Sequence, residues 1–228
     1  MRLAFVFLGG FLTVHPILSA APLPLSSTNL PLRQISPGIF ELGKVRFDKN
    51  QGTVRFPAAI NQTENDIEYL LVTSFGKTHE SLLRTDAEPY HIHLALLLLG
   101  AKDAGTNSFP QDNTLPLPGT PVTIELSWKV KDKEQRARAE EFVYNLQTKS
   151  VMAKGDWIFN GSRVVDGTFI AQQDGSIVSV MEDPDALINN PRPGRENDKI
   201  WRVHSKGLPA LNSPVEVLIR LSRDQPDR

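Results

Sequence analysis

Residues 88–99, with the sequence EPYHIHLALLLL, decide which fold class the sequence predicts. Proline is tolerated in the first turn of a helix, and Gly100 is a typical residue just beyond a helix end, so a helix is predicted from Glu88 to Leu99. Its second half, from Leu94 onward, is apolar on every side. Because such a surface must be covered from several directions, we expect this helix to be buried at the centre of the core.

The segments on both sides of this helix carry strand signals instead. A hairpin is predicted at 44–57, and after Gly76 residues 78–84 are expected to return as the partner of a strand at 67–73. Residues 135–146 fit either helical spacing or the second arm of a hairpin, and both interpretations stay open. The other predicted elements are strands at 122–128, 157–159, 168–171, 177–180, 200–203 and 215–221, and a short helix start at 183–188.

The predicted fold class is therefore α+β, mainly antiparallel β with one buried helix at about 88–99. An internal similarity adds a hypothesis about its symmetry. Residues 115–124 resemble residues 208–217, with a Leu-Pro pair and a Pro-Val pair at the same spacing. This similarity predicts two related halves, each with the order hairpin, helix, strand, and chance similarity is the alternative because the identities are few.

The N-terminal residues have the pattern of a secretory signal. A cationic start is followed by an apolar run that is too short to span a bilayer, and small residues precede a cleavage site near Ala20. We expect a signal peptide at 1–20, export to the periplasm or the exterior, and no transmembrane segment in the mature protein. The predicted mature chain has a Pro/Ser-rich leader or tether at 21–37, a single domain at 38–222 and a polar tail at 223–228.

The composition excludes several classes of function. The chain has 228 residues, a formal net charge of −1 and no cysteine. The lack of cysteine excludes disulfides, thiol nucleophiles and Cys-ligated iron–sulfur clusters. The nearly balanced charge gives no basic surface for nucleic acid, so no nucleic-acid partner is expected. An exported chain without disulfides must fold on its core alone, which is typical of a bacterial envelope protein.

Histidines and carboxylates supply one candidate site. His79, Glu80, His91 and His93 are the candidate ligands of a divalent metal, and His79 with Glu80 is a candidate acid–base pair. Residues two apart on a helix point about 200° from each other, so His91 and His93 cannot face one ion from the same turn. The alternative is that one histidine lines the helix start while the other is solvated. No cofactor other than such a metal is predicted.

A second candidate site follows the predicted strand at 157–159. Gly161, Ser162 and Arg163 have the residue types of an anion pocket, in which converging backbone N–H groups are completed by an arginine. The alternative is a tight turn with a surface arginine, because Gly-Ser pairs are common in turns.

Four motifs in combination resemble a known family. They are GKTHESLL at 76–83, HLAL at 93–96, WIFNGS at 157–162 and DGSI at 174–177. This combination resembles the YdjY-type domain of exported bacterial proteins, over roughly 39–221. The resemblance implies the location and the extent of the domain. It implies no activity, and the redox role of family members with cysteine clusters cannot be transferred to a cysteine-free chain.

These observations lead to three hypotheses of function. The first is a non-catalytic envelope domain that binds an as yet unidentified protein partner or small-molecule ligand. The second is a metal-binding accessory protein or enzyme that uses the histidine and glutamate cluster. The third is a cell-surface interaction protein, in which Trp157, Trp201 or Tyr69 is exposed in a contact patch.

Overall fold

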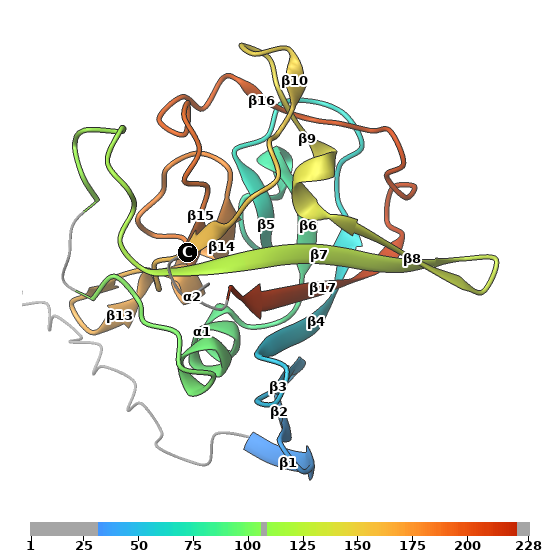
Figure 1. The fold of residues 1–228 in the computed structure, drawn as a ribbon, viewed down its shortest axis with the longest axis vertical. Helices are drawn as coiled ribbons and strands as arrows, with labels where there is room; N and C mark the ends of the chain where they lie inside the picture. The colour runs from blue at the N-terminus through green and yellow to red at the C-terminus, as the bar shows by residue number, and fades with distance from the viewer. Residues whose placement is uncertain (1–31, 106–108, 223–228) are drawn as a thin grey trace, which may run out of the picture. The chain divides into compact units, whose positions relative to one another are not determined.

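The computed structural model describes residues 32–105 and 109–222. Of the described residues, 41% lie in strands and 12% in helices, and eight of the strands form a closed barrel. Figure 1 shows this mostly β architecture. The ring closes because β4 pairs with β17 on one side and with β6 on the other. In ring order the strands are β4 (Thr53–Ile60), β17 (Pro214–Leu221), β7 (Thr120–Val130), β11 (Trp157–Phe159), β15 (Ile188–Asn189), β14 (Ser176–Ser179), β5 (Tyr69–Thr73) and β6 (Ser81–Thr85).

The predicted α+β class with a buried helix is wrong, although the predicted helix exists. Helix α1 spans Pro89–Leu98 and ends at Gly100, whose φ is +95°. One side of α1, including Ile92 and Leu96, is buried, whereas Tyr90 and Leu98 are exposed. The helix therefore covers the barrel wall near β3 and β4 from one side. The interior of an eight-stranded barrel is filled by the side chains of its own strands, so no room remains there for a helix.

The core shows the alternation expected of barrel strands. Along β7, the side chains of Val122, Ile124 and Leu126 are fully buried and their neighbours are less buried. Strands β5 and β14 are buried at every position, as is typical of strands covered on both faces. These apolar side chains account for the stability of a domain without disulfides.

One predicted hairpin is wrong in its direction. Strand β6 pairs with β5 in parallel, not antiparallel, and the two are connected by residues 74–80, which include the 3₁₀ turn η1 at Thr78–Glu80. The short crossover suffices because each strand has only five residues. Gly76 indicates a turn, but it does not determine the direction of β6. That direction depends on β4, which pairs with the other edge of β6.

The ambiguous segment 135–146 is a hairpin arm. Strand β8 (Lys133–Arg138) pairs with β7, and the connecting residues Lys131 and Asp132 both have positive φ. After the 3₁₀ turn η2 (Ala139–Phe142), β9 (Val143–Asn145) forms a separate small sheet. Its partners in that sheet are β10 (Ser150–Val151) and β16 (Trp201–Val203).

Two further predictions in the second half are corrected. Residues 168–171 are not one strand, because β13 (Thr168–Phe169) is followed directly by α2 (Ile170–Asp174), and β13 pairs with β12 (Val164–Val165). Residues 183–188 form no helix. The two-halves hypothesis fails as well, because no helix lies between β14 and β17, and the two strands thought equivalent, β7 and β17, pair with each other.

The N-terminal part extends the sheet outward from β4. Strands β3 (Val45–Asp48), β2 (Ile39–Leu42) and β1 (Leu32–Ser36) form a meander. The antiparallel pairing of β3 with β4 confirms the hairpin predicted at 44–57. Strand β1 falls within the predicted leader at 21–37 and is exposed along its whole length. The predicted signal peptide at 1–20 and the tail at 223–228 lie outside the described residues. No helix in the described ranges is long and apolar enough to cross a membrane.

Candidate functional site

His79 and Glu80 lie together on η1 at the protein surface. The His79 side chain is 78% exposed, and its Nε2 lies 3.5 Å from Glu80 Oε2. A strand would have directed the two side chains to opposite faces, but the 3₁₀ turn brings them side by side. An exposed pair of this kind is well solvated, and the structure adds no third ligand or enclosing wall to it.

His91 packs against the turn between β2 and β3. A Cβ placed on Gly43, whose φ is +57°, would lie 2.6 Å from His91 Nδ1. The other ring nitrogen, Nε2, lies 3.9 Å from Glu88 Oε2. The buried His91 ring therefore fills space that a side chain at position 43 would need. His91 is a core residue at the start of the helix.

His93 lies on another side of α1, among aromatic rings. Its ring centroid is 5.5 Å from that of Phe159 and 5.0 Å from that of Phe169. Its Nδ1 is buried without a hydrogen-bond partner. Burial lowers the pKa of His93, and the nearby Asp103 carboxylate opposes this shift only in part. The neutral imidazole is therefore the stable form at this position.

The structure does not bring the four predicted metal ligands together. As helical geometry predicts, His91 and His93 face different neighbours, and the His79–Glu80 pair lies on a separate turn. Within 32–105 and 109–222, no three His, Asp or Glu side chains are placed to hold one metal ion. The geometry therefore gives the metal hypothesis no support.

The side-chain donors of Ser162 and Arg163 in the predicted anion pocket are engaged within the chain. Ser162 Oγ donates a hydrogen bond to the Asp185 carbonyl at 2.6 Å and accepts one from the Ala171 N–H at 3.1 Å. Arg163 binds the Asp185 carboxylate with Nε at 2.7 Å and Nη2 at 3.0 Å. Because these side chains already have partners, the arrangement favours a structural role for this segment over an anion pocket.

Gly161 connects the two predicted sites. Its φ is +88°, and an added Cβ would overlap Asp103 Cβ and lie 3.2 Å from His93 Cε1. The helix residue His93 and Gly161 are thus neighbours, although they are 68 positions apart in the sequence. Asp103, the third member of this contact, was not among the predicted residues, and its loop position offers no sequence signal.

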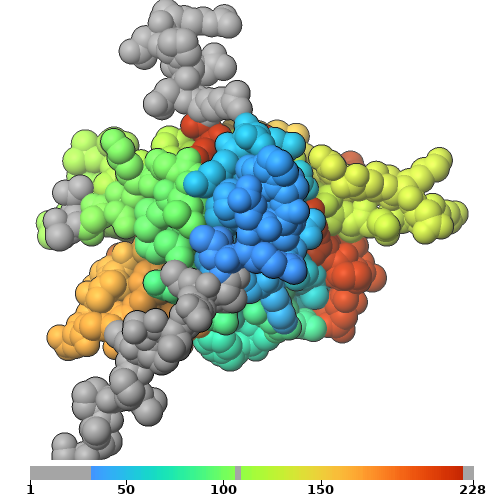
Figure 2. All heavy atoms as spheres, turned by 90° about the horizontal axis from the view of Figure 1, so that it is seen from below, coloured from blue at the N-terminus to red at the C-terminus, as the bar shows by residue number. Residues whose placement is uncertain are grey.

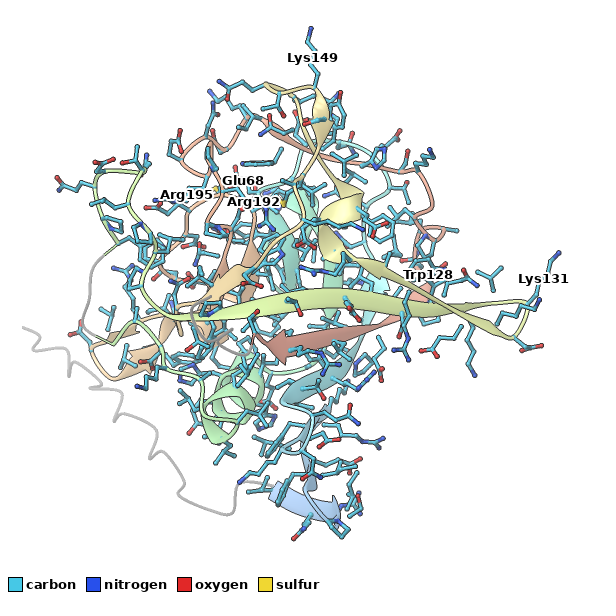
Figure 3. All side chains as sticks on the ribbon, in the orientation of Figure 1. Glu68, Trp128, Lys131, Lys149, Arg192 and Arg195 are labelled. Atoms are coloured by element: carbon cyan, nitrogen blue, oxygen red, sulfur yellow. The ribbon has the colours of Figure 1, made fainter. Side chains whose placement is uncertain are left out.

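A buried ionic cluster was also missed by the sequence analysis. Glu140 is fully buried, and its Oε1 accepts hydrogen bonds from Arg138 Nη2 at 2.7 Å, Arg192 Nη2 at 3.0 Å and the Gly155 N–H at 3.2 Å. The Arg192 guanidinium lies over the Trp157 ring, 5.2 Å from its centroid. Figure 3 labels Arg192. Burial lowers the pKa of Arg192, and the Glu140 carboxylate opposes that shift. These contacts tie η2 to the loop after β15.

The three aromatic residues proposed for a contact patch are all buried, so that hypothesis is wrong for them. Trp157 and Trp201 belong to the core, and Tyr69 donates a hydrogen bond from its hydroxyl to Asp183 Oδ2 at 2.8 Å. Lys77 Nζ donates to the same hydroxyl at 2.6 Å. Burial and the Asp183 carboxylate raise the pKa of Tyr69, so this network keeps the phenol protonated.

An open groove of about 740 Å³ lies beside the outer part of β7. Trp128 contributes to its wall and packs edge-on against Phe142, with ring centroids 6.0 Å apart. The opposite wall is formed by residues 209–216. No sequence motif predicts this groove. Its one sequence signal is Trp128, an aromatic residue at the point where the predicted strand meets a polar turn. The lining residues are Pro57, Ser127, Trp128, Lys129, Val130, Asp132, Glu134, Pro209, Ala210, Ser213, Pro214, Val215 and Glu216.

Fold and site define a closed β-barrel domain with an open surface groove, in which the predicted metal ligands are dispersed and the His79–Glu80 pair lies at the surface. The chain belongs to the YdjY domain family, whose model matches residues 45–220. This match begins at the first residue of β3 and ends within β17, and it confirms the family resemblance drawn from the four motifs. No curated protein and no solved structure matches the chain.

Proposed function

We propose that this chain is a non-catalytic binding domain of the bacterial envelope, and that its groove receives an extended peptide segment of a partner protein. The observation that carries the proposal is the groove beside Trp128. Its volume of about 740 Å³ lies in the range of ligand sites. The exported location rests on the secretory pattern of residues 1–20 and on the absence of cysteine.

A free strand edge favours a peptide over a compact ligand. The pairing of β17 with β7 ends at Glu216 and Ser127, whereas β7 continues to Val130. In the described part of the chain, no strand pairs with this last portion of β7 on the groove side. An extended peptide can add to such an edge through main-chain hydrogen bonds, and side-chain pockets then supply specificity.

The lining of the groove sets the chemistry of the peptide. Trp128 and Val130 offer apolar surface on one wall, and Pro209 and Pro214 on the other. Two rim carboxylates already have arginine partners, since Glu134 pairs with Arg136 and Glu216 with Arg55. The groove therefore selects mainly for apolar side chains in an extended backbone.

A peptide-display selection on the mature protein tests this proposal. Selected peptides should bind wild-type protein and lose at least tenfold in affinity with Trp128→Ala, because a central aromatic anchor is removed. The matched control is Phe75→Ala, which removes an aromatic side chain that is 65% exposed and does not line the groove. A selection without binders, or binders that tolerate Trp128→Ala as well as Phe75→Ala, would contradict the proposal.

A further inference from the structure

The hairpin of β7 and β8 extends beyond the barrel as a two-stranded ribbon. It ends at the turn of Lys131 and Asp132, with Lys131 at its tip (Figures 1 and 3). In the space-filling view the ribbon stands clear of the rest of the domain (Figure 2). Strand β8 pairs with β7 along one edge, and no described strand pairs with its other edge.

The backbone polarity of this free edge follows from the turn. A two-residue loop makes Val130 and Lys133 a hydrogen-bonded pair, so alternate residues of β8 use their N–H and C=O groups on β7. The remaining residues, Glu134 and Arg136, direct these groups to the free edge. The edge therefore offers hydrogen-bonding groups in the spacing that an added antiparallel strand requires.

We propose that β8 pairs with β8 of a second copy of this chain, antiparallel about a two-fold axis at Gln135. In this register Glu134 lies opposite Arg136 of the other copy, and the reciprocal pair forms on the other side of the axis. Each pair exchanges both backbone hydrogen bonds and also places opposite charges next to each other. Because the axis passes between two identical residues, the interface is closed and stops at a dimer.

The charge order of the strand selects this register over its neighbours. An axis at Glu134 places two glutamates opposite each other, and an axis at Arg136 places two arginines opposite each other. An axis at Lys133 sets Asp132 against Glu134, and an axis at Ala137 sets Arg136 against Arg138. Like charges directly opposite each other destabilise a sheet. The charges of β8 therefore oppose pairing with unrelated strands and with β8 in these four registers, but they favour the register centred on Gln135.

The side chains are already arranged for this pairing. Glu134 and Arg136 lie on the same face of β8, where Arg136 donates to Glu134 Oε1 from Nε at 3.0 Å and from Nη2 at 2.9 Å. In the dimer, two glutamates and two arginines alternate across the axis as one network. On the other face, Gln135 meets its copy beside Trp128, which is its partner in the β7–β8 register. Two short paired strands bury little surface, so this self-association is expected to be weak.

Charge reversals test the register in solution, since both residues are exposed and the changes leave the core intact. In sedimentation equilibrium, Glu134→Arg alone and Arg136→Glu alone should each weaken self-association at least tenfold. An equimolar mixture of the two variants should dimerise, because each mixed pair regains opposite charges, and the double variant in one chain should recover as well. A mixture that stays monomeric, or single variants that associate like wild type, would overturn the proposal.

A cysteine cross-link tests the axis itself, and the cysteine-free chain makes the result unambiguous. Mature protein with Gln135→Cys should oxidise to a disulfide-linked dimer, because the two positions face each other in a pair whose Cα atoms are about 4.5 Å apart. The matched control Lys133→Cys should cross-link at least tenfold more slowly, since residue 133 lies opposite Ala137. Equal rates for the two variants, or no cross-link with Gln135→Cys, would refute the two-fold at Gln135.

Discussion

The buried Glu140 cluster offers the sharpest test of how this domain is stabilised. Glu140→Gln keeps the shape of the side chain but removes the negative charge that faces Arg138 and Arg192. Both arginines contact the same oxygen, at 2.7 Å and 3.0 Å, and their side chains are mostly buried. The variant therefore leaves two arginines without a counter-charge in a poorly solvated position.

The expected loss follows from the burial of the partners. Breaking a buried ion pair from one side costs about 3–5 kcal/mol, and the residual exposure of Arg138 reduces this to about 2–4 kcal/mol here. A domain of this kind has about 5–15 kcal/mol of total stability, so the loss is large but the variant still folds. Urea denaturation of the mature protein, followed by tryptophan fluorescence, measures it as a lower midpoint at unchanged slope.

An exposed pair of the same chemistry provides the control. Glu134→Gln removes the carboxylate that contacts Arg136, and both side chains of this pair are 52% exposed. The expected change in the free energy of unfolding is below about 1 kcal/mol, because exposed ion pairs contribute little. If Glu140→Gln costs no more than Glu134→Gln, the buried cluster does not stabilise the domain and the reasoning is refuted.

Three further predictions concern His93, Gly161 and the N-terminus. Burial lowers the pKa of His93, so at low pH the unfolded chain takes up a proton at this residue more readily than the folded chain does. The free energy of unfolding should therefore fall as the pH drops below about 6.5. Urea titrations at pH 8 and pH 5 should show a smaller loss of stability between the two pH values for His93→Phe than for the wild-type protein. Gly161→Ala should lower the free energy of unfolding by at least about 2 kcal/mol, because strain at positive φ and overlap with Asp103 add together. Gly167→Ala has the strain but no atom within 4 Å of the added Cβ, and should lower it by about 1 kcal/mol. Equal midpoints of the two variants in thermal denaturation would contradict this prediction. Sequencing of the exported protein should give Ala21 as its first residue, and a secreted product that still begins at Met1 would rule out the predicted cleavage.

Local sequence patterns foresaw much of the secondary structure. Pro89 marks the start of the helix, because the backbone N–H that proline lacks has no hydrogen-bond partner in a first helical turn. Gly100 marks its end, because glycine adopts positive φ without strain. The hairpin interpretation left open for residues 135–146 is correct for β8, and the loop before it, Lys131 and Asp132, adopts the positive φ that a two-residue hairpin requires. Predictions of this kind succeed where the cause lies within a few neighbouring residues.

The candidate site was foreseen only in part, because its contacts join distant segments. His93 and Gly161 were singled out separately, yet nothing in either segment shows that they are neighbours. Glu140 and Arg192 are 52 positions apart, and no local pattern separates them from the exposed charges around them. One of the three hypotheses needed Trp157 or Trp201 to be exposed, and both are buried, because a strand's alternation does not say which face the barrel closes over.

The sequence by itself determined the family, the boundaries of α1 and most strands of this protein, because motifs, end residues and alternation are local properties of the chain. Only the tertiary structure decided that the sheet closes. Closure requires β4 to pair with β6 on one edge and with β17 on the other, and β17 lies at the far end of the domain sequence from β4. Once the ring is closed, strand side chains fill its interior, and the helix 88–99 that decided the predicted fold class lies on its outside.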